Sequence, residues 1–292
     1  MALRPGALLK GAVICTGAFL VMLALAYGSS EARWLDASAL QGFLGLQGGR
    51  VSPITERLGS LGDPLPVVVA VGVLAAIALA RGRPRVAFLV LLFVGLTSIS
   101  SQALKALLAY PRSDEVVNGA HIAPAAFPSG HATASMTVAL ALVIVAAPRL
   151  RPVAALVGSA LALAVSFSVV SRGWHFPSDV IGGFLLATGW ALVLLAGLRA
   201  ADGRFPQRTG RGTLVRPVRA TVDLLAGVGL VAVLIGGVIL VVGLIVAAVA
   251  FRPPDLVGYA QDHTAFIVVA TLLGLSAVAL LGGLASVLAR RG

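Results

Sequence analysis

Long apolar runs separated by short polar segments occupy most of this chain. A helix needs about 20 apolar residues to cross the hydrocarbon core of a bilayer. The pattern therefore predicts eight transmembrane helices, at residues 9–28, 65–80, 86–108, 131–148, 153–172, 178–198, 222–251 and 265–288. The second run is short for a span, so we expect that helix to include Pro64 and to use the arginines at its other end. The predicted fold is an all-α integral membrane protein.

Composition supports this class of protein. The 292 residues are 59% hydrophobic and 11% charged, whereas soluble domains carry roughly twice that charged fraction. The net charge of +11 does not indicate a nucleic-acid partner, because the basic residues form short clusters between apolar runs. The single cysteine, Cys15, excludes a disulfide within the chain and a thiolate metal cluster.

The basic residues also predict the orientation in the membrane. With both termini in the cytoplasm, 15 of the 22 Lys and Arg residues fall on inner segments, as the positive-inside rule requires. We therefore expect a multi-pass protein of the cell membrane, with anionic lipid as a partner of its cytoplasmic arginine clusters. The first span has a signal-peptide alternative, since Arg4 and Lys10 precede it and Gly28-Ser29-Ser30 offers small residues for cleavage. We expect it to be retained.

An arginine-rich segment divides the chain. Residues 199–221 contain six arginines together with glycine and proline, which predicts a flexible cytoplasmic linker. It separates a six-helix part, residues 1–198, from a transmembrane hairpin, residues 222–292. Gly229, Gly236 and Gly243 recur every seven residues in the seventh span, and such a stripe lets another helix approach closely. The stripe suits packing within the chain or a homodimer formed through the hairpin.

Three polar clusters lie at the predicted outer ends of spans three to six. The first contains two cations, Lys105 at the end of the third span and Arg112 in the loop that follows. Taken alone, Lys105 would be explained as a lysine whose ammonium reaches the interface. The other two clusters lie at the starts of the fourth and sixth spans and contain histidines.

The second cluster is Pro128-Ser129-Gly130-His131, immediately before the fourth span. Free N–H groups at a helix start and the helix dipole favour an anion, although Ser129 could equally be an ordinary N-cap. The third cluster runs from Ser171 to Asp179. If a helix starts near His175, Asp179 lies one turn later on the same face. A carboxylate on one imidazole nitrogen leaves the other as a nucleophile or base; a purely structural pair is the alternative.

Together the clusters resemble the three-part signature of the type 2 phosphatidic acid phosphatase (PAP2) superfamily, which vanadium-dependent haloperoxidases share. The residues that carry the resemblance are Lys-x6-Arg, Pro-Ser-Gly-His, and His-x3-Asp after an arginine. The six-helix part resembles the membrane-embedded branch of that family, and the last two helices lie outside the resemblance. Two departures occur. Arg112 is followed by Ser113 instead of proline, and two residues instead of five separate Arg172 from His175.

The resemblance implies hydrolysis of a lipid phosphate through a phosphohistidine, without metal or other cofactor, at the extracytoplasmic face. His175, oriented by Asp179, would attack phosphorus, and His131 would protonate the leaving oxygen and then activate water. No carboxylate cluster that would hold Mg²⁺ occurs in the outer segments. The phosphate oxygens would be bound by Lys105, Arg112, Ser129, Gly130 and Arg172.

The first expected substrate is a polyprenyl diphosphate such as undecaprenyl diphosphate, followed by phosphatidic acid and phosphatidylglycerol phosphate. An acyl hydrolase that uses Ser129, His175 and Asp179 is a weaker alternative, because it gives the cations no role and the serine lacks a G-x-S-x-G context. A membrane protein that binds or translocates lipid phosphates without hydrolysing them is a further alternative. The displaced Arg172 and the additional hairpin keep that alternative open.

Overall fold

The computed structural model describes residues 5–47, 51–110, 122–204 and 256–289, and all regular elements in these ranges are helices. A 3₁₀ turn, Pro148–Leu150, precedes α7. The α-helices are α1 (Pro5–Gly28), α2 (Ser30–Gly45), α3 (Val51–Ser60), α4 (Pro64–Ala80), α5 (Pro84–Leu107), α6 (Gly130–Val145), α7 (Arg151–Ser171), α8 (Pro177–Arg204), α10 (Leu256–Asp262) and α11 (Thr264–Ala289).

Local sequence determines where several helices begin. Proline occupies the first or second position of α4, α5 and α7, and Pro177 opens α8. These are positions where its missing N–H has no intrahelical partner to lose. Ser29 and Ser129 cap α2 and α6, each accepting a hydrogen bond from the backbone N–H three residues later.

Within the described ranges, five helices are long and apolar enough to cross a membrane: α1, α5, α7 with its preceding turn, α8 and α11. The pair α3 and α4 forms a sixth candidate that is bent by 51° at the break between them. The central helix α6 is apolar but has 16 residues. Seven of the predicted ranges thus coincide with helices, while the predicted span 222–251 lies outside the described residues. The eight-span topology and the placement of the termini stay predictions.

Two predicted boundaries differ from the structure. α6 ends at Val145 instead of 148, because Pro148 disfavours helical backbone in the residue before it. α8 continues to Arg204, into the segment assigned to the flexible linker. The end of α8 is tied to the start of α5 by an ion pair of 2.7 Å between Asp202 and Arg85. The rest of the predicted linker, residues 205–221, lies outside the described residues.

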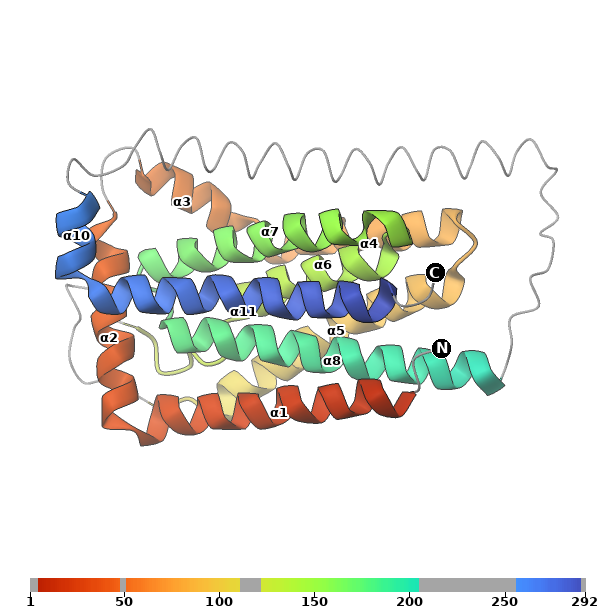
Figure 1. The fold of residues 1–292 in the computed structure, drawn as a ribbon, viewed down its shortest axis with the longest axis horizontal. Coiled ribbons are helices and arrows are strands. Elements are labelled where there is room, and N and C mark those ends of the chain that lie inside the picture. The colour runs from red at the N-terminus through yellow and green to blue at the C-terminus, as the bar shows by residue number, and fades with distance from the viewer. Residues whose placement is uncertain (1–4, 48–50, 111–121, 205–255, 290–292) are drawn as a thin grey trace.

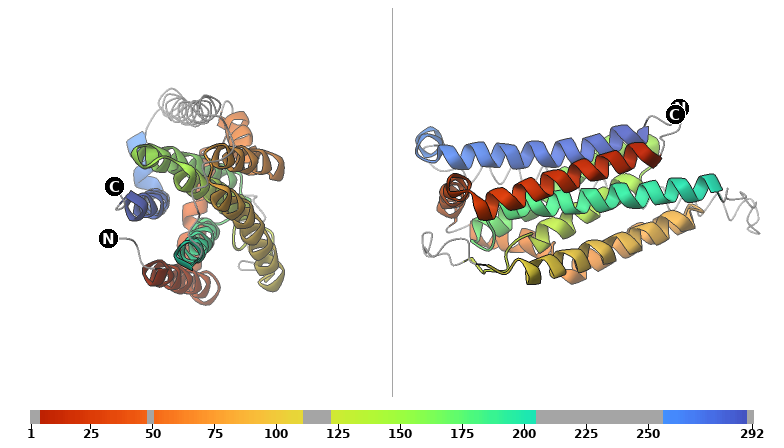
Figure 2. Two further views of the ribbon diagram at one scale, coloured as in Figure 1. Left: turned by 90° about the vertical axis from the view of Figure 1, so that its right-hand side faces the viewer. Right: turned by 90° about the horizontal axis from the view of Figure 1, so that it is seen from below.

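The long helices run side by side, with α6 in the middle (Figures 1 and 2). α4, α5, α7, α8 and α11 all contact α6, and nearly every residue of α6 from Ala132 to Val145 is buried. This explains why the fourth run is apolar on all sides. The perimeter is apolar as well, with exposed side chains such as Val13, Phe88 and Leu275, as expected where lipid replaces water.

α11 packs into the same bundle, chiefly against α7 and α2. Its buried face carries Leu273, Ala277 and Leu281. The short helix α10 adds a contact at the end of the bundle, where the Tyr259 hydroxyl donates to the Gly42 carbonyl and burial raises the pKa of that phenol. One face of α11, the second helix of the predicted hairpin, therefore packs against the rest of the same chain. A homodimer formed through its other surface stays a prediction.

α2 lies across one end of the bundle, beside α10, almost perpendicular to the long helices (Figure 1). It buries Leu40 and Phe43 and leaves Trp34 exposed, so one face of α2 packs against the bundle. α1 begins and α11 ends at the opposite end of the bundle (Figure 1). The starts of α6 and α8 lie at the end that α2 covers, since Ser178 of α8 donates to Asp36 of α2 and Ser129 donates to Asp179. His131 is the second residue of α6, and His175 lies in the turn just before α8.

Candidate active site

The turn between α7 and α8 sets the position of His175. Arg172 is the C-cap of α7, and Gly173 has a φ of 70°, a left-handed conformation that glycine adopts without steric cost. The N–H groups of Gly173 and Trp174 donate to the carbonyls of Val170 and Val169, the pattern of a Schellman C-cap. Only two residues separate Arg172 from His175, and this tight turn reverses the chain within that short distance.

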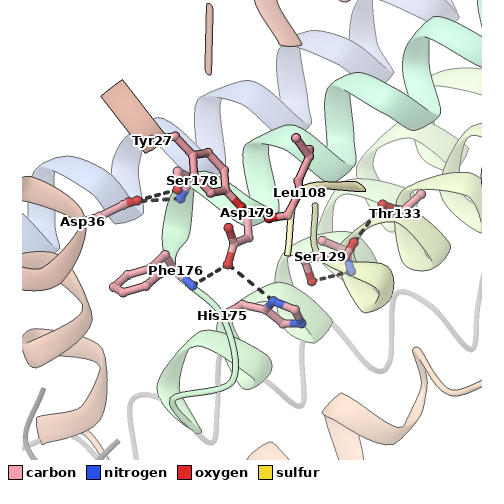
Figure 3. Close-up of polar contacts among 10 residues, drawn as sticks. Tyr27, Asp36, Leu108, Ser129, Thr133, His175, Phe176, Ser178 and Asp179 are labelled. Carbon is pink, nitrogen blue, oxygen red and sulfur yellow. Dashed lines mark hydrogen bonds and ion pairs between the residues drawn. The ribbon is translucent and has the colours of Figure 1, made fainter. Parts of the chain in front are cut away.

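Asp179 joins His175 to the first turn of α8. Its Oδ2 lies 3.5 Å from His175 Nδ1 and accepts a hydrogen bond of 2.9 Å from the Phe176 N–H (Figure 3). In the second contact, the side chain of Asp179, the third residue of α8, accepts from the N–H of Phe176, the residue just before the helix. This is one half of a capping box. Asp179 is fully buried and His175 is 6% exposed. The predicted pair is therefore present, with an N–O distance longer than a hydrogen bond.

The backbone of Asp179 also holds the start of α6. Its carbonyl accepts a 2.9 Å hydrogen bond from the Ser129 N–H, and the Ser129 carbonyl in turn accepts from the Thr133 hydroxyl at 2.7 Å (Figure 3). Gly183 permits this contact, because a Cβ there would lie 2.9 Å from the Ser129 oxygen. Ser129 Oγ caps α6 by accepting from the Ala132 N–H, so the N-cap alternative holds alongside any role in binding.

His131 also has a carboxylate partner, which the sequence analysis did not identify. Its Nε2 lies 3.2 Å from Oδ1 of Asp63, the residue before α4. Its ring lies 5.7 Å from the Trp174 ring, centroid to centroid. Lys105 and His175 are both close enough for their charges to act on His131. Each candidate histidine thus has an aspartate beside it, and the two histidines face a shared electrostatic environment.

The three predicted cations have different outcomes. Lys105 lies beside the second cluster, since a Cβ built on Gly130 would be 3.5 Å from its Nζ. It also interacts electrostatically with Asp179. The guanidinium of Arg172 stacks over the Trp174 ring, with 4.1 Å between Cζ and the ring centroid. Arg112 lies outside the described residues. The structure therefore brings His131, His175, Asp179, Ser129, Gly130 and Lys105 together, and it places Arg172 on the tryptophan that borders His131.

Two further residues missed by sequence reasoning hold the site in place. Asp36 of α2 accepts hydrogen bonds from the Ser178 N–H, at 3.1 Å, and from the Ser178 hydroxyl. Tyr27 of α1 donates to the Leu108 carbonyl at the end of α5, at 3.0 Å (Figure 3). An aspartate directly after Trp34 and Leu35 was the available sequence signal for Asp36. No sequence pattern pointed to Tyr27.

An apolar groove runs along the outside of the bundle next to this site. It has a volume of about 510 Å³ and is lined by α1, α5 and α8. Its walls include Phe19, Leu104, Leu107, Leu185 and Trp190. Leu104 precedes Lys105 in sequence, and Leu185 lies within one turn of Gly183 on α8. The groove therefore reaches to within about one helical turn of the polar cluster.

The fold and the site define a membrane-embedded helical protein with two histidines and a lysine at one end of its bundle. Residues 85–201 match the sequence model of the PAP2 superfamily, so this segment of the chain is similar to members of that family. A search of curated proteins gave no match.

A solved structure shares the fold. It is the crystal structure of a transmembrane PAP2-type phosphatidylglycerolphosphate phosphatase from Bacillus subtilis, with a TM-score of 0.53 and 23% sequence identity. The match covers 68% of this chain and 98% of that one. The expected resemblance to the PAP2 family is confirmed by the match of residues 85–201 to the family model, and the crystal structure shows a shared fold.

The Asp36–Ser178 contact predicts a measurable coupling. Asp36→Ala leaves buried donors of α8 without this acceptor, which costs about 1–3 kcal/mol of unfolding free energy. Asp36→Ala, Ser178→Ala and the double variant should show a coupling of about 0.5–3 kcal/mol in detergent unfolding measurements. The exposed Glu56 provides a control, Glu56→Ala, with a change near zero. Strictly additive effects of the two substitutions would contradict the role assigned to Asp36.

Proposed function

We propose that this protein is a lipid phosphate phosphatase that uses His175 as its nucleophile. The observation that carries the proposal is the convergence of His131, the His175–Asp179 pair and Lys105 around the start of α6. The match of residues 85–201 to the PAP2 superfamily model supports it. The geometry of the residues and the family therefore favour the same reaction class.

The reaction proceeds in two steps. Asp179 at Nδ1 of His175 leaves Nε2 with the lone pair, and Nε2 attacks phosphorus while the bond to the lipid oxygen breaks. His131 donates its proton to that oxygen, which leaves as an alcohol or, for a diphosphate, as the lipid monophosphate. His131 then takes a proton from water, which attacks the phosphohistidine and releases inorganic phosphate. Both histidines return to their starting states.

Charge stabilisation comes from the start of α6 and from α5. Lys105 lies beside Gly130, where the first N–H groups of α6 point outward along the helix axis. Together they neutralise oxygens of the phosphate in the transition state. Arg112 and Arg172 are assigned to the same task, Arg172 by a swing of its guanidinium away from Trp174.

The groove beside the site supports a lipid substrate over a water-soluble one. When the hydrocarbon chain of a lipid lies in the groove along α1, α5 and α8, its head group lies near Lys105 and His131, at the polar end of the bundle. Polyprenyl diphosphates, phosphatidic acid and phosphatidylglycerol phosphate all have this form. The name of the Bacillus subtilis relative makes phosphatidylglycerol phosphate the first glycerolipid to test. The site faces the extracytoplasmic side in the proposed topology.

A non-catalytic lipid-phosphate binder is a second candidate, favoured by one observation. Arg172 stacks on Trp174, and two residues instead of the family's five separate it from His175. Phosphate release by the purified protein that equals release by His175→Ala, with lipid binding retained, would establish this candidate instead.

The first test removes the two histidines. His175→Ala and His131→Ala should each lower phosphate release from lipid phosphates at least about 100-fold, because each removes a proton-transfer or bond-forming group. His263→Ala, at the junction of α10 and α11, is the matched control and should keep wild-type activity. Activity of the wild type should be insensitive to EDTA. Loss of activity on chelation, or unimpaired His175→Ala, would refute the mechanism.

The second test concerns Asp63. Asp63→Asn removes the carboxylate that orients the His131 ring, so kcat should fall by about 10- to 100-fold with a smaller change in KM. The pH profile of kcat should change shape as well, which simple destabilisation would not produce. Glu56→Gln, an exposed amide substitution on α3, is the control. A wild-type profile for Asp63→Asn would show that the 3.2 Å contact has no part in turnover.

The third test concerns the groove. Ala103 lines it and Ala106, also exposed on α5, does not. Ala103→Trp fills the groove and should lower kcat/KM for a long-chain lipid phosphate by about tenfold or more, since lost apolar contact weakens binding. The same variant should act normally on a water-soluble phosphomonoester. If Ala106→Trp impairs the lipid substrate as strongly, the groove does not hold the chain.

A further inference from the structure

A second polar pocket lies at the opposite end of the bundle. Lys105 and Arg85 are near the two ends of α5, roughly 30 Å apart at 1.5 Å per residue. The pocket has a volume of about 180 Å³ and lies among α5, α6, α7, α8 and α11. At roughly 15 Å³ for each water, this volume holds on the order of ten waters, which is enough space for a phosphate group.

Positive charge dominates this pocket. Its described lining contains one acidic side chain, Asp202, which is paired with Arg85 at 2.7 Å. It contains four arginines, Arg83, Arg85, Arg151 and Arg199. The charged groups that line it therefore carry a net charge of +3 within the described residues. None of these side chains belongs to the site around His131 and His175.

Backbone carbonyls hold two of these arginines in fixed positions. Arg83 donates to the Val145 carbonyl at the end of α6, at 3.0 Å, and Arg151 donates to the Leu288 carbonyl near the end of α11. Arg151 is 6% exposed, which is unusual for arginine. Hydrogen bonds to neutral carbonyls orient a guanidinium without cancelling its charge, so the attraction for an anion persists.

Two further features point to an anion. α5 and α7 both begin at this pocket, and neither has a side-chain cap, so their dipoles favour negative charge there. The Nε of Arg199 is buried and has no hydrogen-bond partner within the described part of the chain. A donor in that state costs free energy unless a ligand or water accepts from it.

We propose that this pocket binds a phosphate group, taken from the head group of an anionic lipid or from free phosphate in solution. The predicted orientation places it at the cytoplasmic face, where anionic head groups collect and where basic pockets between helices bind them. The proposal is independent of the chemistry at His175. It also gives the expected anionic-lipid partner a specific location.

The test uses the full-length protein purified in a neutral detergent. One arm titrates inorganic phosphate and pyrophosphate, and the other titrates short-chain phosphatidylglycerol against phosphatidylcholine. Arg199→Gln should bind the effective probe about tenfold more weakly, the loss expected for one charge-assisted hydrogen bond. Arg204→Gln is the matched control, because Arg204 is exposed on the same helix and does not line the pocket. The His131–His175 site is the same in both variants.

A second substitution, which is expected to strengthen binding, keeps the test decisive if the arginine variant misfolds. Asp202→Asn removes the one acidic side chain of the described lining and should tighten binding several-fold. A response in the lipid arm alone identifies a lipid head group as the ligand, and a response in the inorganic arm, with or without the lipid arm, shows that phosphate free in solution is sufficient. The proposal is overturned if the wild type binds neither probe, if Arg199→Gln and Arg204→Gln bind equally, or if Asp202→Asn does not tighten binding.

Discussion

Asp179 is the residue on which the rest of the site depends. One oxygen of its carboxylate contacts both His175 and the Phe176 N–H, and its backbone carbonyl holds the Ser129 N–H. A single buried residue therefore caps α8, orients the candidate nucleophile and fixes the start of α6. Because Asp179 is fully buried, its charge is stable only while these donors and the nearby Lys105 compensate its lost hydration.

The close approach of α8 to α6 makes this arrangement possible. Gly182 lies against the Phe127 ring, and Gly183 against Ser129 and Thr133, at distances that leave no room for a Cβ. Two adjacent glycines thus bring the second and third sequence clusters together, although His131 and His175 lie 44 positions apart in the sequence. Asp36, from the helix that crosses the end of the bundle, fixes the same turn of α8 from the other side.

The sequence was sufficient for local features and for the family, and insufficient for contacts between distant segments. Seven apolar runs coincide with helices because proline, serine and hydrophobic length act within a few residues. The His175–Asp179 pair follows from helical spacing alone. The Asp63–His131 and Asp36–Ser178 contacts join residues 68 and 142 positions apart, so no local pattern encodes them. The contact of Arg172 with Trp174 depends on the Schellman turn at Gly173, which redirects the chain after α7.

Two sites of positive charge on one bundle would have opposite consequences for a phosphate. α5 and α8 carry residues of both, with Lys105 and Asp179 at one end and Arg85 and Arg199 at the other. At the first end, the proposed mechanism gives the role of nucleophile to a histidine with a carboxylate behind it, so bound phosphate would be transferred. The described lining of the second pocket contains arginines but no histidine, serine or cysteine. Guanidinium groups stay protonated and are poor nucleophiles, so a phosphate bound there is held and not cleaved. The difference between the two ends lies in the nucleophile, since positive charge and helix starts occur at both.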